Sequence, residues 1–274
     1  MKNLRKNIYK TKRREAKEIR KNFKADLLKA AAISTGGEFR SVEVLLKETD
    51  TLKFIPELRP VLFPEKSGIV NFKPATIAKR LSELGNLAGM VVPTDSTYLG
   101  GDVSWPNLIR LYTPAPVIVR DFYVEPVQVY RTRAIGADAL LIDLDYCQPE
   151  AIQILADATM EMGLEFFIEL NSGNLASSPL PPELSGIILN MSPAELKNAG
   201  KSFLRDLRVK FPGNPVFIAR CLITSAEDAL LAGSMGFSGI MSNNEYWQQK
   251  NPFESFRTVG EWCSKNAVEK LKNK

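Results

Sequence analysis

Eight short apolar runs recur through most of the chain, and amphipathic stretches with helical spacing lie between them. The apolar runs are Arg59–Phe63, Leu87–Val92, Pro116–Arg120, Ala139–Leu144, Glu165–Leu170, Gly186–Asn190, Val216–Ala219 and Gly239–Met241. The predicted helices include Pro74–Leu84, Pro126–Ala134, Pro149–Met162, Pro193–Phe203, Ser225–Ala232 and Pro252–Lys265, several of which open with a proline that suits a first helical turn. Eight successive strand-helix units predict an α/β fold, a parallel (β/α)8 TIM barrel, more than an open doubly wound sheet.

The positive charge of the chain is concentrated at its start. Residues 1–30 carry +9, so the remaining residues carry −4 of the overall +5. We therefore predict a basic N-terminal helical extension over residues 1–50 and a barrel over residues 51–274. The basic segment 1–30 is a candidate docking element for an acidic protein partner, or simply a solvated helix. Nucleic acid is a disfavoured partner because neither aromatic interleaving nor a nucleic-acid motif accompanies the charge.

Composition excludes several classes of chemistry. The 274 residues contain no histidine, so Ser-His-Asp, Cys-His and HExxH sites cannot exist. The three cysteines lack CxxC spacing, and neither a dinucleotide fingerprint nor a P-loop follows any predicted strand. We expect no cofactor and no metal site. No apolar run reaches the roughly 18 residues of a membrane span, and the expected location is the cytoplasm, with an organelle stroma or matrix left open.

The third-strand region carries a specific family resemblance. Val119–Tyr130 (VRDFYVEPVQVY) is similar to the "LRKDFIIDPYQIY" segment of indole-3-glycerol phosphate synthases, and Thr94–Gly101 (TDSTYLGG) is similar to their "TExxYFxGS" loop. Ile223–Asp228 resembles the start of their seventh helix, and Ile8–Arg20 resembles their N-terminal helix. The resemblance implies a TIM barrel and, for an active member, the carboxy-lyase that closes the indole ring in tryptophan biosynthesis.

The resemblance also implies what an active site needs. In that family a third-strand lysine is the general acid and a second lysine stabilises charge. Glutamates serve as base and support, and backbone N–H groups of glycine turns after strands seven and eight hold a phosphate. These groups lie at the carboxyl ends of the barrel strands.

Some of these positions are kept in this sequence. Glu169 matches the fifth-strand glutamate and Asn190 the sixth-strand asparagine, while Arg120 stands at the catalytic lysine. An arginine preserves the charge but holds its proton near neutral pH, so it cannot readily act as a proton donor.

Other positions are substituted. Aligned on the Ser and Gly that follow, the first-strand "AEVK" motif places Pro60 at the glutamate and Leu62 at the lysine. In the seventh strand Arg220 replaces a glutamate and Cys221 a serine. The glycines that approach the phosphate fall at Leu222 and Asn243, two residues that do not readily adopt glycine conformations. Binding of a small phosphorylated ligand is therefore expected to be weakened.

New polar residues accompany these losses. Asp143 and Asp145 are two apart at the end of the fourth strand, and with Glu169, Arg120, Arg220 and Asn190 they could form a charge-paired mouth. Two interpretations stay open: a pocket for a different ligand, zwitterionic or a carboxylate-held cation, and an internal ion-pair network that fills the pocket. Cys221 is either a core residue or, beside Arg220, a thiol with a lowered pKa.

Three hypotheses about function follow. The leading one is a catalytically degenerate relative of indole-3-glycerol phosphate synthase, a pseudoenzyme kept for a binding or structural role. The second is a divergent active synthase that uses Lys66, Arg120 and Glu169. The third is new chemistry at Asp143, Asp145, Glu169 and Arg220.

Overall fold

The computed structural model describes residues 2–35, 38–47, 52–65, 67–69, 72–171, 180–200, 202–211 and 213–264. Its central element is an eight-stranded parallel sheet in the order β1-β10-β9-β8-β7-β6-β5-β4. The strands are β1 (Lys53–Ile55), β4 (Met90–Pro93), β5 (Val117–Arg120), β6 (Ala139–Asp143), β7 (Glu165–Asn171), β8 (Gly186–Asn190), β9 (Val216–Arg220) and β10 (Gly239–Met241). Bridges between Phe54 and Leu87 and between Glu57 and Val91 join the two ends of the sheet, so the predicted barrel is confirmed.

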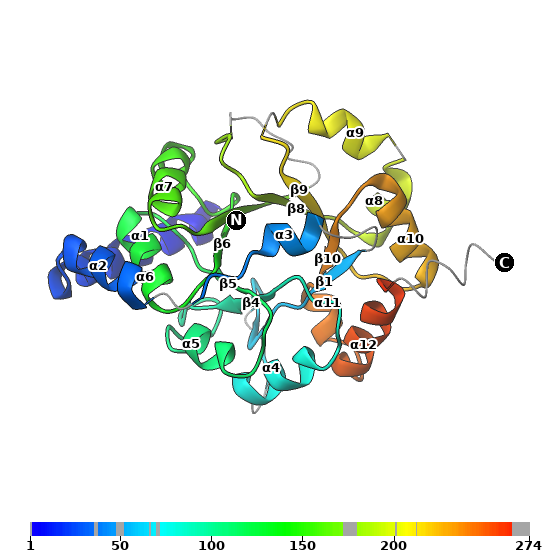
Figure 1. The fold of residues 1–274 in the computed structure, drawn as a ribbon, viewed down its shortest axis with the longest axis horizontal. Helices are drawn as coiled ribbons and strands as arrows, with labels where there is room; N and C mark the ends of the chain where they lie inside the picture. Colours follow the sequence, from blue (N-terminus) through cyan, green and yellow to red (C-terminus); the bar gives the residue numbers. More distant parts are fainter. Residues whose placement is uncertain are drawn as a thin grey trace.

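Helices surround the ring of strands (Figure 1). They are α4 (Pro74–Ser82), α5 (Trp105–Arg110), α6 (Pro126–Ala134), α7 (Pro149–Glu161), α8 (Pro193–Asn198), α9 (Phe203–Arg208), α10 (Ala226–Met235), α11 (Asn244–Trp247) and α12 (Pro252–Trp262). The predicted prolines do stand in the first turns of α4, α6, α7, α8 and α12. The single helix predicted over Pro193–Phe203 is two helices, α8 and α9, because Gly200 adopts a left-handed conformation (φ 73°) between them.

The first strand was predicted in the wrong place. The run Arg59–Phe63 contains β2 (Val61–Leu62), which pairs with β3 (Ser67–Gly68) in a small antiparallel hairpin outside the barrel. The barrel strand is the shorter run Lys53–Ile55. Pro60 and Pro64 flank the apolar run and lack the amide hydrogens that a central parallel strand must donate, which explains why it does not join the ladder.

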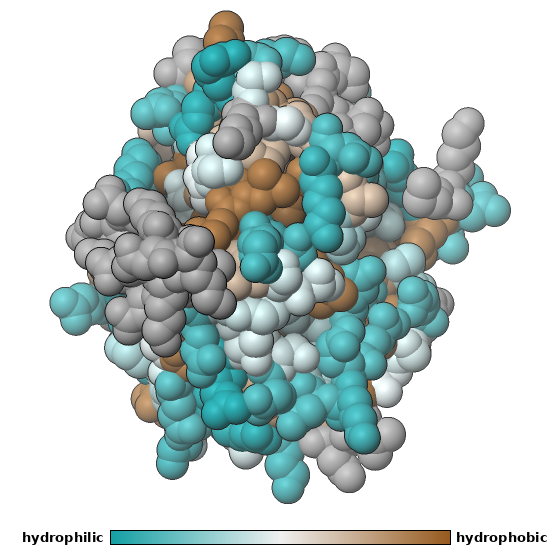
Figure 2. Space-filling view, turned by 90° about the vertical axis from the view of Figure 1, so that its right-hand side faces the viewer, coloured by the Kyte–Doolittle hydropathy of each residue, from teal (hydrophilic) through white to brown (hydrophobic). Residues whose placement is uncertain are grey.

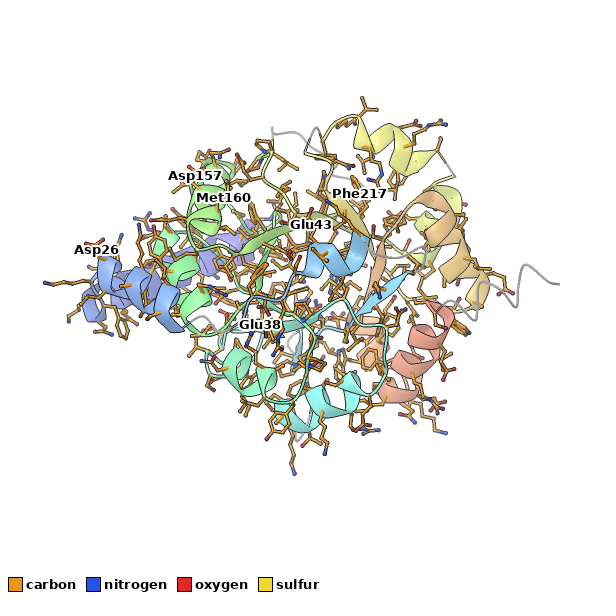
Figure 3. The ribbon with its side chains drawn as sticks, in the orientation of Figure 1. Asp26, Glu38, Glu43, Asp157, Met160 and Phe217 are labelled. Carbon is orange, nitrogen blue, oxygen red and sulfur yellow. The ribbon has the colours of Figure 1, made fainter. Side chains whose placement is uncertain are left out.

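A short helix closes the amino-terminal end of the barrel. This helix, α3 (Val42–Lys47), lies over the centre of the ring of strands in Figure 1, and its Glu43 is labelled there in Figure 3. Val42 and Leu46 are buried in one cluster with strand residues such as Phe167. The Glu165 carboxylate, at the start of β7, accepts the amide hydrogen of Val42 at 2.9 Å and so caps the helix.

A long helix lies against the opposite end. This helix, α1 (Lys2–Asn22), is followed by α2 (Ala25–Thr35), which packs on α6. Ile8 of α1 is fully buried in a cluster with Phe63, Tyr98 and Phe122, which follow β2, β4 and β5. The N-terminal segment is therefore attached to the carboxyl ends of barrel strands. Within the described part of the chain, no helix has both the length and the apolarity to cross a membrane.

Candidate active site at the carboxyl ends of the strands

Four charged side chains form a closed ring of ion pairs at the carboxyl ends of the strands. Arg120 of β5 bonds Glu169 of β7 at 2.6 Å, and Glu169 bonds Arg220 of β9 at 2.7 Å. Arg220 reaches Glu57 at 3.2 Å, and Glu57, just after β1, returns to Arg120 at 3.3 Å. We call these four residues the ion-pair ring. Each arginine lies between two carboxylates and each carboxylate between two arginines.

Two further charges extend the ring without unbalancing it. Arg59 donates through Nε to Glu57 at 2.8 Å and also bonds the side chain of Asn244. Asp143, at the end of β6, pairs with Arg120 at 3.1 Å. The mouth therefore contains three arginines and three carboxyl groups, whose charges balance when Asp143 is ionised.

Burial makes these pairs interdependent. Glu57, Arg120, Glu169 and Arg220 are between 2% and 6% exposed. Burial alone would raise the pKa of Glu169, but Arg120 and Arg220 outweigh it and hold the pKa at about 2. Burial would likewise lower the pKa of Arg120, yet Glu169, Glu57 and Asp143 raise it above its ordinary value. Arg120 thus holds its proton more firmly than a free arginine does.

The first-strand motif lies three residues earlier than predicted. Pro60 and Leu62 belong to the β2–β3 hairpin region, and neither takes part in the ring. Glu57 and Arg59 instead carry the Glu-x-cation spacing of "AEVK", because both side chains point from the end of β1 into the mouth. The structure thus places a glutamate and a cation just after the first barrel strand, where the sequence predicts Pro60 and Leu62. Lys66 lies outside the described residues.

The signal for this motif was present in the sequence. Glu57 and Arg59 stand two apart directly after the short apolar pair Phe54-Ile55. The Ser and Gly that anchor the predicted alignment lie in β3 of the hairpin, outside the barrel, and so do not mark the end of the barrel strand.

Asp143 and Asp145 do not act as one pair. Asp143 faces Arg120, whereas Asp145 lies on the rim, where it binds Arg5 of α1 at 3.1 Å and accepts a hydrogen bond from the Asn171 side chain. Asn190 donates to the Asn171 side chain at 3.0 Å, so it also lies on this rim and not in the ring. Among the described residues, no group of three or more Cys, Asp and Glu side chains is arranged to hold a metal ion.

Cys221 is a buried residue. It is fully buried at the end of β9, and burial raises the pKa of its thiol to about 12. The thiol is therefore protonated at neutral pH, and the alternative of a lowered pKa beside Arg220 is wrong.

The two turns expected to hold phosphate are occupied by the protein itself. After β9, the amide of Ile223 donates to the Tyr246 hydroxyl at 3.0 Å, and that hydroxyl donates to the Cys221 carbonyl at 3.1 Å. Tyr246 is fully buried. After β10, Asn243 adopts an extended conformation (φ −124°) and its side chain accepts from the amide of Glu245 at 3.1 Å.

A pocket beside the first of these turns does not resemble a phosphate site. It measures about 270 Å³ and is lined by residues of the β9–α10 loop and of α12, including Leu222, Glu254 and Trp262. It belongs to the side of the barrel where α10 and α12 lie, and Figure 2 shows on that side one apolar area bordered by hydrophilic side chains. Thr224, Ser255 and Thr258 also line it, but the described lining includes no lysine or arginine, and an anion there would meet the Glu254 carboxylate.

Asp143 gives the site a specific pH dependence. Burial and the neighbouring Glu169 raise the pKa of Asp143 to about 7, against the opposing effect of Arg120. The folded state therefore binds a proton that the unfolded state has released between about pH 4 and about pH 7, and stability falls as pH rises through this window.

We expect Asp143→Asn to remove this dependence. We compare the unfolding free energy of the variant with that of the unmodified protein at about pH 5 and at about pH 8. The difference, variant minus unmodified protein, should be at least about 1 kcal/mol larger at the higher pH, because only the unmodified protein loses stability. Urea denaturation at both pH values measures it. If this difference does not depend on pH, Asp143 is already ionised at about pH 5. The control variant is Asp157→Asn, on the exposed surface of α7.

Fold and site together define a (β/α)8 barrel with charged residues gathered where barrel enzymes place their chemistry. The family model described as indole-3-glycerol phosphate synthase matches residues 5–241. The chain therefore belongs to the indole-3-glycerol phosphate synthase family.

Individual relatives agree with this assignment at low identity. The indole-3-glycerol phosphate synthase of Chlorobium limicola is 27% identical over 200 residues, which cover 72% of this chain and 76% of that protein. The Chlorobaculum tepidum synthase is 25% identical over 239 residues, covering 85% and 91%. Among solved structures, a mutant tryptophan synthase alpha-subunit from Pyrococcus furiosus has a TM-score of 0.56 at 11% identity, covering 82% of this chain and 99% of that one. That likeness concerns the barrel fold alone.

Proposed function

We propose that this protein has lost the synthase activity of its family and keeps the barrel as a binding or structural component. The observation that carries the proposal is the ion-pair ring. The carboxylates Glu57 and Glu169, which match family glutamates, are each neutralised by two or more arginines within a buried network. A carboxylate held at a pKa of about 2, as Glu169 is, makes a poor proton acceptor.

The proton donor is missing as well. Arg120 stands where the family has its general acid, and its two carboxylate partners in the ring hold its proton in place. Loss of general acid catalysis alone typically reduces a rate by ~10²–10⁴. Replacement of Arg120 by lysine should therefore restore little, because Arg220 would still neutralise Glu169.

Binding of the phosphate is also opposed. The amide of Ile223 already donates to Tyr246, and the amide and hydroxyl of Thr224 both donate to the Asp228 carboxylate, at 3.1 and 2.7 Å. A phosphate in this turn would have to displace these partners and approach the negative charge of Asp228.

A divergent active synthase is the second candidate. It is favoured by the retention of Glu57 together with Glu169 and Asn190 at family positions, which is more of the catalytic set than the sequence alone indicated. The two candidates differ in whether the family substrate enters the mouth.

Equilibrium binding of 1-(o-carboxyphenylamino)-1-deoxyribulose 5-phosphate separates them. We expect no saturable binding below about 1 mM, the upper end of common KM values. The Chlorobaculum tepidum synthase is the positive control. Micromolar binding that inorganic phosphate competes away would favour the divergent synthase.

A further inference from the structure

The cationic side chains of α1 from Arg5 to Lys21 fall into two sets. One set faces the barrel and is paired: Arg5 with Asp145, Lys12 with Asp95 and Asp121, and both Arg13 and Arg20 with Glu125. Arg5, Arg13 and Arg20 of this set remain partly exposed, whereas Lys12 is buried. The other set is also exposed, and the structure gives its members no ion pair with any described residue. These residues, which we call the outer row, are Lys6, Lys10, Arg14, Lys17 and Lys21.

The spacing of the outer row places it on one face of the helix. Successive members are three or four residues apart, which corresponds to neighbouring positions on a helical surface. From Lys6 to Lys21 the row extends over roughly 22 Å at the rise of an α-helix. Glu18 is the acidic residue on the exposed surface of α1, so the row keeps a large excess of positive charge.

The row is held rigid by the opposite face of the helix. Ile8, Ala16 and Ile19 are buried, and Lys12 is inserted between two buried carboxylates. A partner would therefore meet a preformed line of charge and would not have to order the helix, which lowers the entropic cost of binding.

We propose that the outer row is a docking surface for an acidic helix of a partner protein. The inference rests on the proposed function, since a barrel that no longer catalyses its family reaction acts through the molecules that it binds. Carboxylates three and four residues apart on one helix face repeat at the same 5–6 Å interval as the row, so the two faces can pair in register.

Features of the same helix oppose two other occupants. Membrane association of a basic amphipathic helix requires its apolar face, and here that face is buried against the barrel. Single-stranded nucleic acid would require exposed aromatic rings along the row. Tyr9, the aromatic residue of α1, is half-buried, with the Arg13 guanidinium 5.9 Å from its ring centre.

An apolar contact is available where the row ends. Phe23 is 54% exposed and Leu27 is 65% exposed, immediately after α1 and at the start of α2. Figure 3 shows this end of the segment, with Asp26 labelled, projecting from the barrel on the left. An exposed aromatic beside a charged row matches the composition of protein interfaces, in which aromatic anchors carry much of the affinity.

The test compares two labelled helical peptides of identical composition. One has its glutamates on a single face at three- and four-residue spacing, and the other has them distributed around the helix. Binding to the full chain is measured by fluorescence anisotropy at low and at physiological salt. The protein variants are Lys10→Glu with Lys17→Glu, and a control with the same charge change far from α1, Lys79→Glu with Lys250→Glu.

The proposal predicts that the one-face peptide binds at least about fivefold more tightly than its isomer. It also predicts that the Lys10→Glu/Lys17→Glu variant loses about tenfold in affinity while the control does not. Equal binding of the two peptides, or equal losses in both variants, would overturn it.

Three parallel measurements cover the rival occupants. The proposal would be overturned if the protein bound poly(U) RNA, or vesicles of 3:1 phosphatidylcholine to phosphatidylserine, more tightly than it binds the one-face peptide. A dimer that the Lys10→Glu/Lys17→Glu variant abolishes would also overturn it. Synthase turnover is measured on the same samples. Turnover together with one-face peptide binding would overturn the loss of activity alone, whereas no turnover with no peptide preference would overturn the docking surface alone.

Discussion

Replacing Arg220 with methionine is expected to lower the free energy of unfolding by about 3–5 kcal/mol, the usual cost of removing one partner from a buried ion pair. Arg220 is 6% exposed and bonds Glu57 and Glu169. Its removal leaves the buried carboxylates Glu57 and Glu169 with one arginine fewer each, so the mouth then holds three carboxyl groups against two arginines.

The double variant Glu169→Leu with Arg220→Met should recover most of that loss. It leaves Glu57 and Asp143 facing Arg59 and Arg120, a balanced set whose remaining contacts all exist in the unmodified protein. Urea denaturation followed by tryptophan fluorescence measures both variants. Arg205→Met, which removes an exposed pair with Asp206, is the control and should change stability by less than about 1 kcal/mol.

The outcome discriminates between two accounts of the ring. A double variant as unstable as the single one would mean that the arginine supports the fold by packing and not by charge balance. A single variant without effect would mean that water or another group already compensates the carboxylates, and the ring would not be a closed network.

Replacing Lys12 with methionine is the second large effect we expect, again about 3–5 kcal/mol. The Lys12 ammonium lies 2.6 Å from Asp95 and 2.7 Å from Asp121, and all three side chains are at most 2% exposed. Burial would lower the pKa of Lys12, but Asp121, Asp95 and Glu15 raise it above its ordinary value. Without the ammonium, the two buried carboxylates would repel each other, with Arg131, 3.3 Å from Asp121, as their remaining counter-charge.

This loss should be accompanied by release of α1. We expect faster proteolysis within residues 2–22 and an increase in dye binding as the cluster around Ile8 and Phe122 becomes exposed. Adding Asp95→Asn and Asp121→Asn to Lys12→Met should restore about half of the stability. Lys10→Met, on the exposed face of the same helix, is the matched control. Unchanged proteolysis in Lys12→Met would show that apolar packing alone holds the helix.

The position of Lys12 could have been predicted from the sequence. Ile8, Lys12, Ala16 and Ile19 recur at spacings of four, four and three, so the lysine lies in the middle of the apolar stripe of α1. A lysine there must either leave the stripe or find a buried counter-charge. The net charge of residues 1–30 does not indicate this position, because a charge count does not distinguish a buried lysine from an exposed one.

The barrel was predictable because each strand and helix carries its own periodicity. Gly186–Asn190 and Gly239–Met241 have the predicted bounds, and α6 has too. The exception, β1, has three residues, so its local signal is weaker than that of the flanking apolar run.

The ion-pair ring was not predictable at the level of contacts. Glu57 and Arg220 are 163 residues apart and meet because the barrel closes. The sequence predicts a charged mouth that contains Asp143, Arg120, Glu169 and Arg220, but it also includes Asp145 and Asn190, which the structure places on the rim. It does not distinguish a ligand pocket from an internal network. That distinction depends on the pairing distances and on Glu57, which supplies the charge that closes the ring.

The ion-pair ring is proposed to leave the catalytic positions of the family unable to transfer protons. A turnover assay with the family substrate tests this most directly. Purified protein is incubated with 1-(o-carboxyphenylamino)-1-deoxyribulose 5-phosphate while indole fluorescence is followed, with the Chlorobaculum tepidum synthase as the active control. We predict no product above the level given by the Glu169→Gln variant. Turnover in the unmodified protein that Glu169→Gln abolishes would contradict the account and identify a divergent synthase.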